Sequence, residues 1–220
     1  MNATLAPSNW DLLPPTVRTA LQSRLEALQS LEGWATLQKR EHLARLVIDH
    51  NAMRCVEIGV FGGQSLLAIA LATELLPDGD RAQVVGYDPY TKEAALEGDN
   101  DKANDEWWSK LDLAAIHRSA LEAIGSLGLS SRCQIRTKTD IEAADDFTNG
   151  TVDLLHLDAN HAKAISLRSA ALWLPKVRAG GIVIQDDCNW DSVKPTVAWL
   201  DEQATRLEWP EGATWGAWVV

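Results

Sequence analysis

The sequence predicts an α/β fold in which a doubly wound, mainly parallel sheet is covered by helices on both faces. Short apolar runs typical of strands alternate with helix-length segments from about residue 52 onward. A glycine-rich turn follows the first of these runs, and acidic residues follow three of the others. Open sheets of this kind hold ligands at the carboxyl ends of their strands. The length of 220 residues suits one domain with a full hydrophobic core.

Residues 1–51 predict a helical cap in front of the sheet. The Pro14-Pro15 pair is placed to start a helix at about Thr16. Apolar residues then recur at helical spacing at Val17, Leu21, Leu25 and Leu28. Gly33 interrupts the pattern, and a second helix is expected from about residue 35 to residue 50.

Residues 52–220 predict the α/β core. Its strands are expected at residues 54–59, 83–87, 133–137, 152–158 and 182–187, with a Gly180-Gly181 turn before the last. Helices are expected at residues 66–76, 113–127 and 193–203, and between the fourth and fifth strands. Two closing strands, at about 206–209 and 214–219, predict a terminal hairpin around Pro210-Glu211-Gly212. Residues 89–130 are too long for a simple crossover, so they predict an enlarged insertion and a candidate lid.

The composition excludes several classes of protein. The chain has 20 basic and 31 acidic residues, a net charge of −11, which argues against binding to nucleic acid or anionic membranes. Its three cysteines lack the spacing of metal ligands, and no secretory signal or membrane span is evident, so a cytoplasmic protein is expected. Tryptophans in the cap and insertion predict a homodimer.

The glycine turn after the first strand reads V-E-I-G-V-F-G-G-Q-S over residues 56–65. Its G-x-x-G-G spacing differs from the dinucleotide-binding G-x-G-x-x-G pattern, and no phosphate-binding lysine follows. Glu57 before the turn would repel a pyrophosphate. Asp88 ends the second strand, where doubly wound folds bind a ribose diol. A ribose, a positive charge and no phosphate describe S-adenosylmethionine; the alternative is a purely structural turn.

Three carboxylates end the two later strands. Asp158 follows one strand, and Asp186 and Asp187 follow the next, so they should meet at one edge of the sheet. Carboxylates that close repel unless they are protonated or bridged by a cation, and a hard divalent metal is the simplest resolution. Alternatively, Asp158 contacts the amino group of the cofactor, and Asp186-Asp187 forms a turn or caps a helix.

With these motifs, the chain resembles the class I S-adenosylmethionine-dependent methyltransferases from about residue 40 to the end. The glycine turn is similar to the first motif of that family, and G-Y-D-P-Y at residues 86–90 to the second. L-L-H-L-D-A-N-H and G-G-I-V-I-Q-D-D resemble the metal-dependent O-methyltransferases of small molecules, such as catechol and macrocin O-methyltransferases. The resemblance implies a Rossmann-like, seven-stranded sheet with an antiparallel C-terminal strand.

The resemblance also implies roles for particular residues. Cofactor contacts are expected from Glu57, Gly59, Phe61, Gly63, Ser65, Asp88, Thr139, Asp140 and Asp158. The ligands of Mg²⁺ or Mn²⁺ would be Asp158, Asp186 and Asp187. The chain differs from these enzymes at the position of the catalytic base. Catechol enzymes carry a Lys at the position of His161, and sugar enzymes carry an Asp at the position of Asn160. His161 is therefore the predicted base, since its ordinary pKa suits proton transfer near neutrality.

The methyl acceptor is expected to be a small molecule with adjacent oxygens. Asn160 and Trp190 are candidate substrate contacts, Trp107 and Trp108 a candidate lid, and Trp10 and Trp34 candidate covers of the site. Three other functions remain open at this point. They are a metal-independent methyltransferase using His161 or His156, a catalytically inactive binding or scaffold protein, and a nicotinamide dehydrogenase, which the glycine spacing disfavours.

Overall fold

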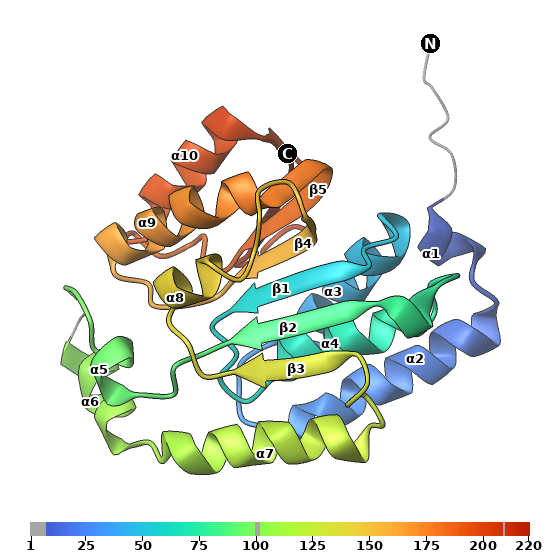
Figure 1. Cartoon of the computed structure of the whole chain (residues 1–220), viewed down its shortest axis with the longest axis horizontal. Coiled ribbons are helices and arrows are strands. Elements are labelled where there is room, and N and C mark those ends of the chain that lie inside the picture. The colour runs from blue at the N-terminus through green and yellow to red at the C-terminus, as the bar shows by residue number, and fades with distance from the viewer. Residues whose placement is uncertain (1–7, 100–101, 209) are drawn as a thin grey trace.

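The computed structural model describes residues 8–99, 102–208 and 210–220, and its centre is a seven-stranded sheet (Figure 1). The strands are β1 (Arg54–Ile58), β2 (Gln83–Tyr87), β3 (Cys133–Arg136), β4 (Val152–Leu157), β5 (Val177–Gln185), β6 (Thr205–Arg206) and β7 (Gly216–Val219). Their order is β3-β2-β1-β4-β5-β7-β6. Strands β1 to β5 are parallel, and β7 is antiparallel to both β5 and β6. The predicted fold class is confirmed.

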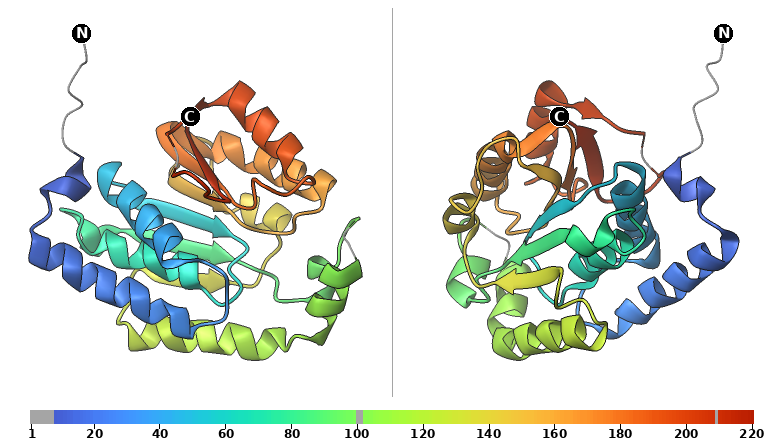
Figure 2. Two further views of the ribbon diagram at one scale, coloured as in Figure 1. Left: turned by 180° about the vertical axis from the view of Figure 1, so that it is seen from behind. Right: turned by 45° about the vertical axis from the view of Figure 1, so that its right-hand side comes forward.

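Helices cover both faces of this sheet (Figures 1 and 2). One face is covered by α3 (Leu37–Asp49), α4 (Gln64–Thr73) and α7 (Leu113–Ser126); α1 (Asn9–Leu12) packs on α3, and α2 (Pro15–Ala27) packs on α3 and α4. The other face packs against α8 (Asp140–Ala144), α9 (Lys163–Trp173) and α10 (Lys194–Gln203). Two helices of the insertion, α5 (Lys92–Ala95) and α6 (Lys102–Lys110), lie beyond the carboxyl ends of β1–β3 (Figure 1). Short 3₁₀ helices occupy residues 28–30, 79–81 and 174–176.

The N-terminal helices share the hydrophobic core of the sheet. Leu25 on α2 and Leu43 on α3 are fully buried in one cluster with α4, whose ten residues are all buried. Helix α4 is apolar all round because it lies between the sheet and this cap, the pattern of an internal helix. Packing against α2 and α4 therefore holds α3 in a defined place near the carboxyl edge of the sheet. Among the described residues, no helix is both long and apolar enough to cross a membrane.

Three sequence-based expectations about the fold are corrected. The Gly180-Gly181 turn is wrong, because β5 begins at Val177 and runs through both glycines. Gly180 has φ +73°, and the pairing of β4 with β5 shifts register beside it, so the glycines form an irregularity within the strand. Helix α1 was not expected. Trp10 on this helix packs in the core rather than over the site. The hairpin strands are shorter than expected, and the predicted end of the first, Trp209, lies outside the described residues.

Candidate active site

The glycine turn connects β1 to α4 at the carboxyl edge of the sheet. Gly59 has φ +89°, and a Cβ atom there would lie 2.1 Å from the backbone oxygen of Asp158. Any other residue would therefore push β1 and β4 apart. Gly63, with φ +86°, precedes the first residue of α4. This geometry brings the turn directly beside the first predicted metal ligand.

A cavity of about 740 Å³ opens above this turn. It is bounded by the glycine turn, the ends of β4 and β5, the insertion, and the segment that leads into α3. Almost all the predicted site residues line it, namely Gly59, Phe61, Gly63, Ser65, Asp88, Thr139, Asp140, Asp158, Asn160, His161, Asp186, Asp187 and Trp190. Residues from five separate segments thus converge on one cavity.

Asp88 braces the turn. Its Oδ2 atom accepts hydrogen bonds from the backbone N–H groups of Val60 and Phe61, and its Oδ1 accepts one from Tyr90. Burial raises the pKa of Asp88, and the three N–H donors partly offset this rise. Asp88 lines the cavity as expected for a ribose ligand, and that role stays a prediction.

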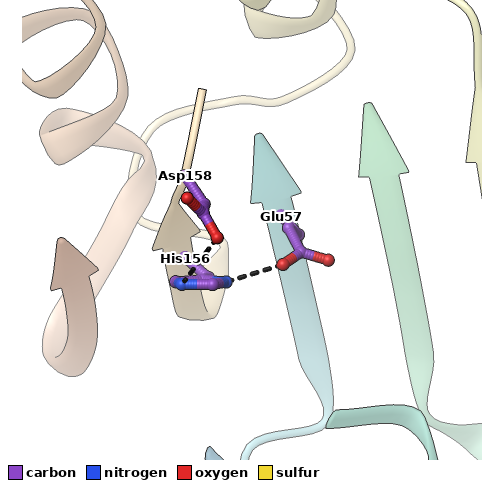
Figure 3. A group of neighbouring side chains, drawn as sticks. All are labelled: Glu57, His156 and Asp158. Atoms are coloured by element: carbon purple, nitrogen blue, oxygen red, sulfur yellow. Dashed lines mark hydrogen bonds and ion pairs between the residues drawn. The ribbon is translucent and has the colours of Figure 1, made fainter. Parts of the chain in front are cut away.

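Glu57 is buried against His156 rather than at the cavity surface (Figure 3). The register of β1 and β4 places the two residues side by side, with Oε1 of Glu57 2.7 Å from Nδ1 of His156. Both side chains are fully buried. Nε2 of His156 lies 4.0 Å from carboxylate oxygens of Asp158 and Asp186. We use the name acid cluster for Asp158, Asp186, Asp187 and His161; Glu57 supports it through His156.

Lys39 is a site residue that the sequence analysis missed. Its Nζ atom lies 3.1 Å from Oδ2 of Asp158 and forms a still closer contact with Oδ2 of Asp186. The lysine comes from α3, and only 6% of its side chain is exposed. The other oxygen of Asp186 accepts the backbone N–H of Asp187. Both carboxylate oxygens of Asp186 therefore have partners within the protein.

His161 forms the second half of the acid cluster. Its Nε2 atom lies 2.8 Å from Oδ2 of Asp187 and 3.8 Å from Oδ1 of Asp158. Burial would lower the pKa of His161, but the two carboxylates more than offset this and raise it to about 9. Burial would likewise raise the pKa of Asp158, and Lys39 with the two histidines instead holds it well below its ordinary value. His161 is therefore a cation at neutral pH in this state.

Part of the acid cluster fits a divalent metal. Donor atoms of Asp158, His161 and Asp187 lie within 4.8 Å of one another, and those of Glu57, His156 and Asp158 form a second such group. Carboxylate oxygens are the ligands that Mg²⁺ and Mn²⁺ prefer, whereas imidazole is more typical of Zn, Cu, Fe and Ni sites. Asp186, the remaining predicted ligand, instead contacts Lys39.

The other predicted cavity residues also hold the walls together. Thr139 caps α8 in a reciprocal pair with Glu142, and Asp140 contacts Arg168 at 3.2 Å. The side-chain amide of Asn160 donates to three backbone oxygens of the insertion, at 2.8–3.3 Å. Asn160, predicted as a substrate contact, therefore ties the insertion to the end of β4.

Aromatic rings form the outer walls of the cavity. We use the name aromatic cluster for Trp34, Phe61, Trp107 and Trp108, whose neighbouring ring centroids lie 4.9–6.0 Å apart. Trp34 precedes α3, and Trp107 and Trp108 belong to α6, so the cap and the insertion meet here. Across the acid cluster, the Trp190 ring lies 5.0 Å from His161. Both groups offer apolar surface to a bound molecule.

Comparison with known proteins identifies the family. The sequence profile of the family described as "Methyltransferase domain" matches residues 56–188, which is more than half of the chain. The chain therefore belongs to this family of methyltransferases. A caffeoyl-CoA O-methyltransferase-like protein of Arabidopsis thaliana is 27% identical over 190 residues, covering 86% of this chain and 68% of the relative.

Two solved structures share the fold. The O-methyltransferase from Bacillus cereus in complex with S-adenosylhomocysteine has a TM-score of 0.57 and 17% identity, over 99% of this chain and 94% of the other. TomG from Streptomyces achromogenes, in complex with S-adenosylmethionine, has a TM-score of 0.58 and 17% identity, over 94% and 90%. The predicted class, an S-adenosylmethionine-dependent O-methyltransferase, is thus confirmed at the level of family and fold.

Proposed function

We propose that the protein methylates a hydroxyl of a small molecule with two adjacent oxygens, and that Mg²⁺ or Mn²⁺ takes part. The observation that supports this most directly is the convergence of Asp158, Asp187 and His161 on one wall of the cavity, beside the glycine turn. Methyl transfer from a sulfonium needs mainly correct placement of the reactants. The acceptor hydroxyl, in contrast, must lose its proton, and this is the step that the acid cluster can assist.

In this proposal, Asp158 and Asp187 would hold the cation, and Asp186 would be a third ligand once its contact with Lys39 is broken. A bound divalent cation lowers the pKa of a hydroxyl that it contacts. His161 takes the hydroxyl proton, and Asp187 orients the imidazole at 2.8 Å. Because the pKa of His161 is raised to about 9 in the present state, the imidazolium must first release its own proton to solvent before the ring can accept the hydroxyl proton. Gly59, Phe61, Gly63, Ser65 and Asp88 surround the cofactor, with Thr139 and Asp140 on its adenine side.

A metal-independent methyltransferase is the second candidate, and the position of Lys39 favours it. The ammonium already bridges Asp158 and Asp186, and its single positive charge offsets one of their two negative charges. In that case Lys39 would stabilise the negative charge that develops on the acceptor oxygen, and His161 would still act as the base.

The acceptor is proposed to be a natural product with an aromatic ring or a sugar ring. The aromatic cluster and Trp190 provide apolar walls for either. Two similar proteins support an acceptor of this kind, namely the caffeoyl-CoA O-methyltransferase-like protein and TomG, which is involved in tomaymycin synthesis. We further propose a cytoplasmic homodimer without a nucleic-acid partner, in keeping with the net charge of −11 and the exposed Trp34 and Trp107.

The test is a methylation assay on the purified protein with S-adenosylmethionine and a panel of catechols and sugars, read out by mass spectrometry. We expect methylated product with Mg²⁺, its loss in excess chelator, and its recovery when Mg²⁺ is restored. Asp187→Ala should abolish the stimulation by metal and leave the calorimetric affinity for S-adenosylhomocysteine nearly intact. Full turnover in excess chelator would contradict the proposed requirement for a metal and favour the metal-independent methyltransferase.

A further inference from the structure

We propose that Lys39 is a built-in counter-ion of the acid cluster, which a divalent cation must displace before Asp158 and Asp186 can bind it. Lys39 would thereby set the metal affinity of the site. This inference rests on the proposed metal-assisted function. It concerns a residue of the N-terminal cap rather than a residue of the motifs that define the family.

The Lys39 ammonium lies between two carboxylates that a metal ion would share. Nζ of Lys39 contacts Oδ2 of Asp186 and lies 3.1 Å from Oδ2 of Asp158. Oxygen ligands surround Mg²⁺ at about 2.1 Å and larger divalent ions at up to about 2.6 Å. An ion shared by these two oxygens would therefore occupy the space that Nζ fills. The nitrogen and the metal exclude each other both by volume and by like charge.

The negative charge of the acid cluster is partly balanced by Lys39. In the present state the Lys39 ammonium is shared by Asp158 and Asp186. These two carboxylates thus have a cationic partner without a metal, which explains why they can lie so close together. A metal ion gains from these oxygens only after the ammonium has left, so its net binding is weakened by the loss of the lysine contacts.

The side chain of Lys39 can leave the two carboxylates by rotating into the cavity. The lysine lines the cavity, so its flexible four-carbon chain can turn toward solvent there while α3 stays in place. The helix itself is held by its packing on α4 and by the cap that Thr36 provides to the backbone of Lys39. Displacement therefore requires a side-chain rotation and no rearrangement of the fold.

The experiment measures Mn²⁺ binding to the full-length protein by electron paramagnetic resonance. The variants are Lys39→Met and Lys39→Gln, which remove the ammonium but keep much of its length. Lys138→Met is the matched control, because it removes the same charge from an exposed ion pair with Asp146. We expect Mn²⁺ to bind at least tenfold more tightly to both Lys39 variants than to the wild type, and equally to the control. Binding of S-adenosylhomocysteine verifies that each variant is folded.

Equal or weaker Mn²⁺ binding by the Lys39 variants overturns the inference and leaves the metal-dependent function standing. Absence of Mn²⁺ binding in every protein overturns the inference together with the metal part of that function. A second measurement needs no substitution. Amine acetylation of the wild type, read by mass spectrometry, should modify Lys39 faster when Mn²⁺ is present and leave Lys138 unchanged. An unchanged rate at Lys39 counts against displacement.

Discussion

The backbone N–H of Phe61 donates a 2.9 Å hydrogen bond to the carboxylate of Asp88, which joins the glycine turn after β1 to the end of β2. The same oxygen accepts the N–H of Val60. Because parallel strands end at one edge of the sheet, an acid after β2 can hold the turn after β1. The wall of the cavity at the glycine turn is therefore shaped by a side chain from the neighbouring strand.

We expect Asp88→Ala to lower the free energy of unfolding by about 2–4 kcal/mol, because three backbone N–H groups lose a charged acceptor. Affinity for S-adenosylhomocysteine should fall at least tenfold as the turn loosens. Asp88→Asn should be intermediate, since one amide oxygen can serve the turn while its NH₂ group faces the N–H of Tyr90. Asp80→Ala, at a fully exposed carboxylate, is the control. Wild-type affinity in Asp88→Ala, measured by calorimetry, would refute this role.

At position 61, substitution by glycine should destabilise the protein less than substitution by alanine. The φ of Phe61, +49°, lies in the left-handed region, which costs a residue with a Cβ atom about 1 kcal/mol. Phe61→Ala loses the ring contacts and keeps this strain, whereas Phe61→Gly loses the contacts and relieves it. Thermal unfolding should therefore show the glycine variant as the more stable of the two. At the exposed helical position Glu122 the order should be reversed, with Ala above Gly.

The buried pair of Glu57 and His156 is expected to be strongly coupled. His156→Phe leaves the Glu57 carboxylate buried without its partner and should cost about 3–5 kcal/mol. Adding Glu57→Gln removes the stranded charge, so the double variant should be at least about 1 kcal/mol more stable than the two single effects predict. Urea denaturation gives the required values. The exposed pair of Arg206 and Asp201 should show a coupling below about 0.5 kcal/mol, and a similarly small value for the buried pair would contradict this interpretation.

The sequence predicted those parts of the fold and site that depend on local patterns. Strand β2 has the expected bounds, and the glycine turn and the acids after β4 and β5 lie where strand ends place them. The Gly180-Gly181 pair was misread because glycines in a strand irregularity have the same local pattern as glycines in a turn.

The partners of the site residues could not be predicted in the same way. Lys39 lies 119 residues from Asp158 in the sequence, within a polar helical segment that resembles an ordinary exposed face. Its burial arises only because α3 packs on α4 and thereby aims this one side chain at the sheet edge. Similarly, the length of residues 89–130 indicated an insertion, but its attachment through Asn160 depends on the folded loop.

The titration of His161 provides a further prediction. The carboxylates of Asp158 and Asp187 raise its pKa from the ordinary 6.5 to about 9, although burial alone would lower it. A raised pKa means that the folded protein binds the proton more tightly than the unfolded chain does. The resulting stabilisation is fully present below pH 6.5 and is lost as the pH rises through about 9. Asp187→Asn removes the carboxylate at 2.8 Å and should bring the pKa of His161 back toward its ordinary value.

Imidazole resonances in nuclear magnetic resonance spectra, followed over pH 5–10 with His161→Gln to assign the signal, measure this pKa directly. In the metal-free wild type we expect the midpoint near pH 9, and in Asp187→Asn a midpoint at least one unit lower. Asp191→Asn, at an exposed acid paired with Lys194, should leave it unchanged. A wild-type midpoint near 6.5 would show that the carboxylates do not hold the proton. His161 would then be free to act as a base at neutral pH without any other group lowering its pKa.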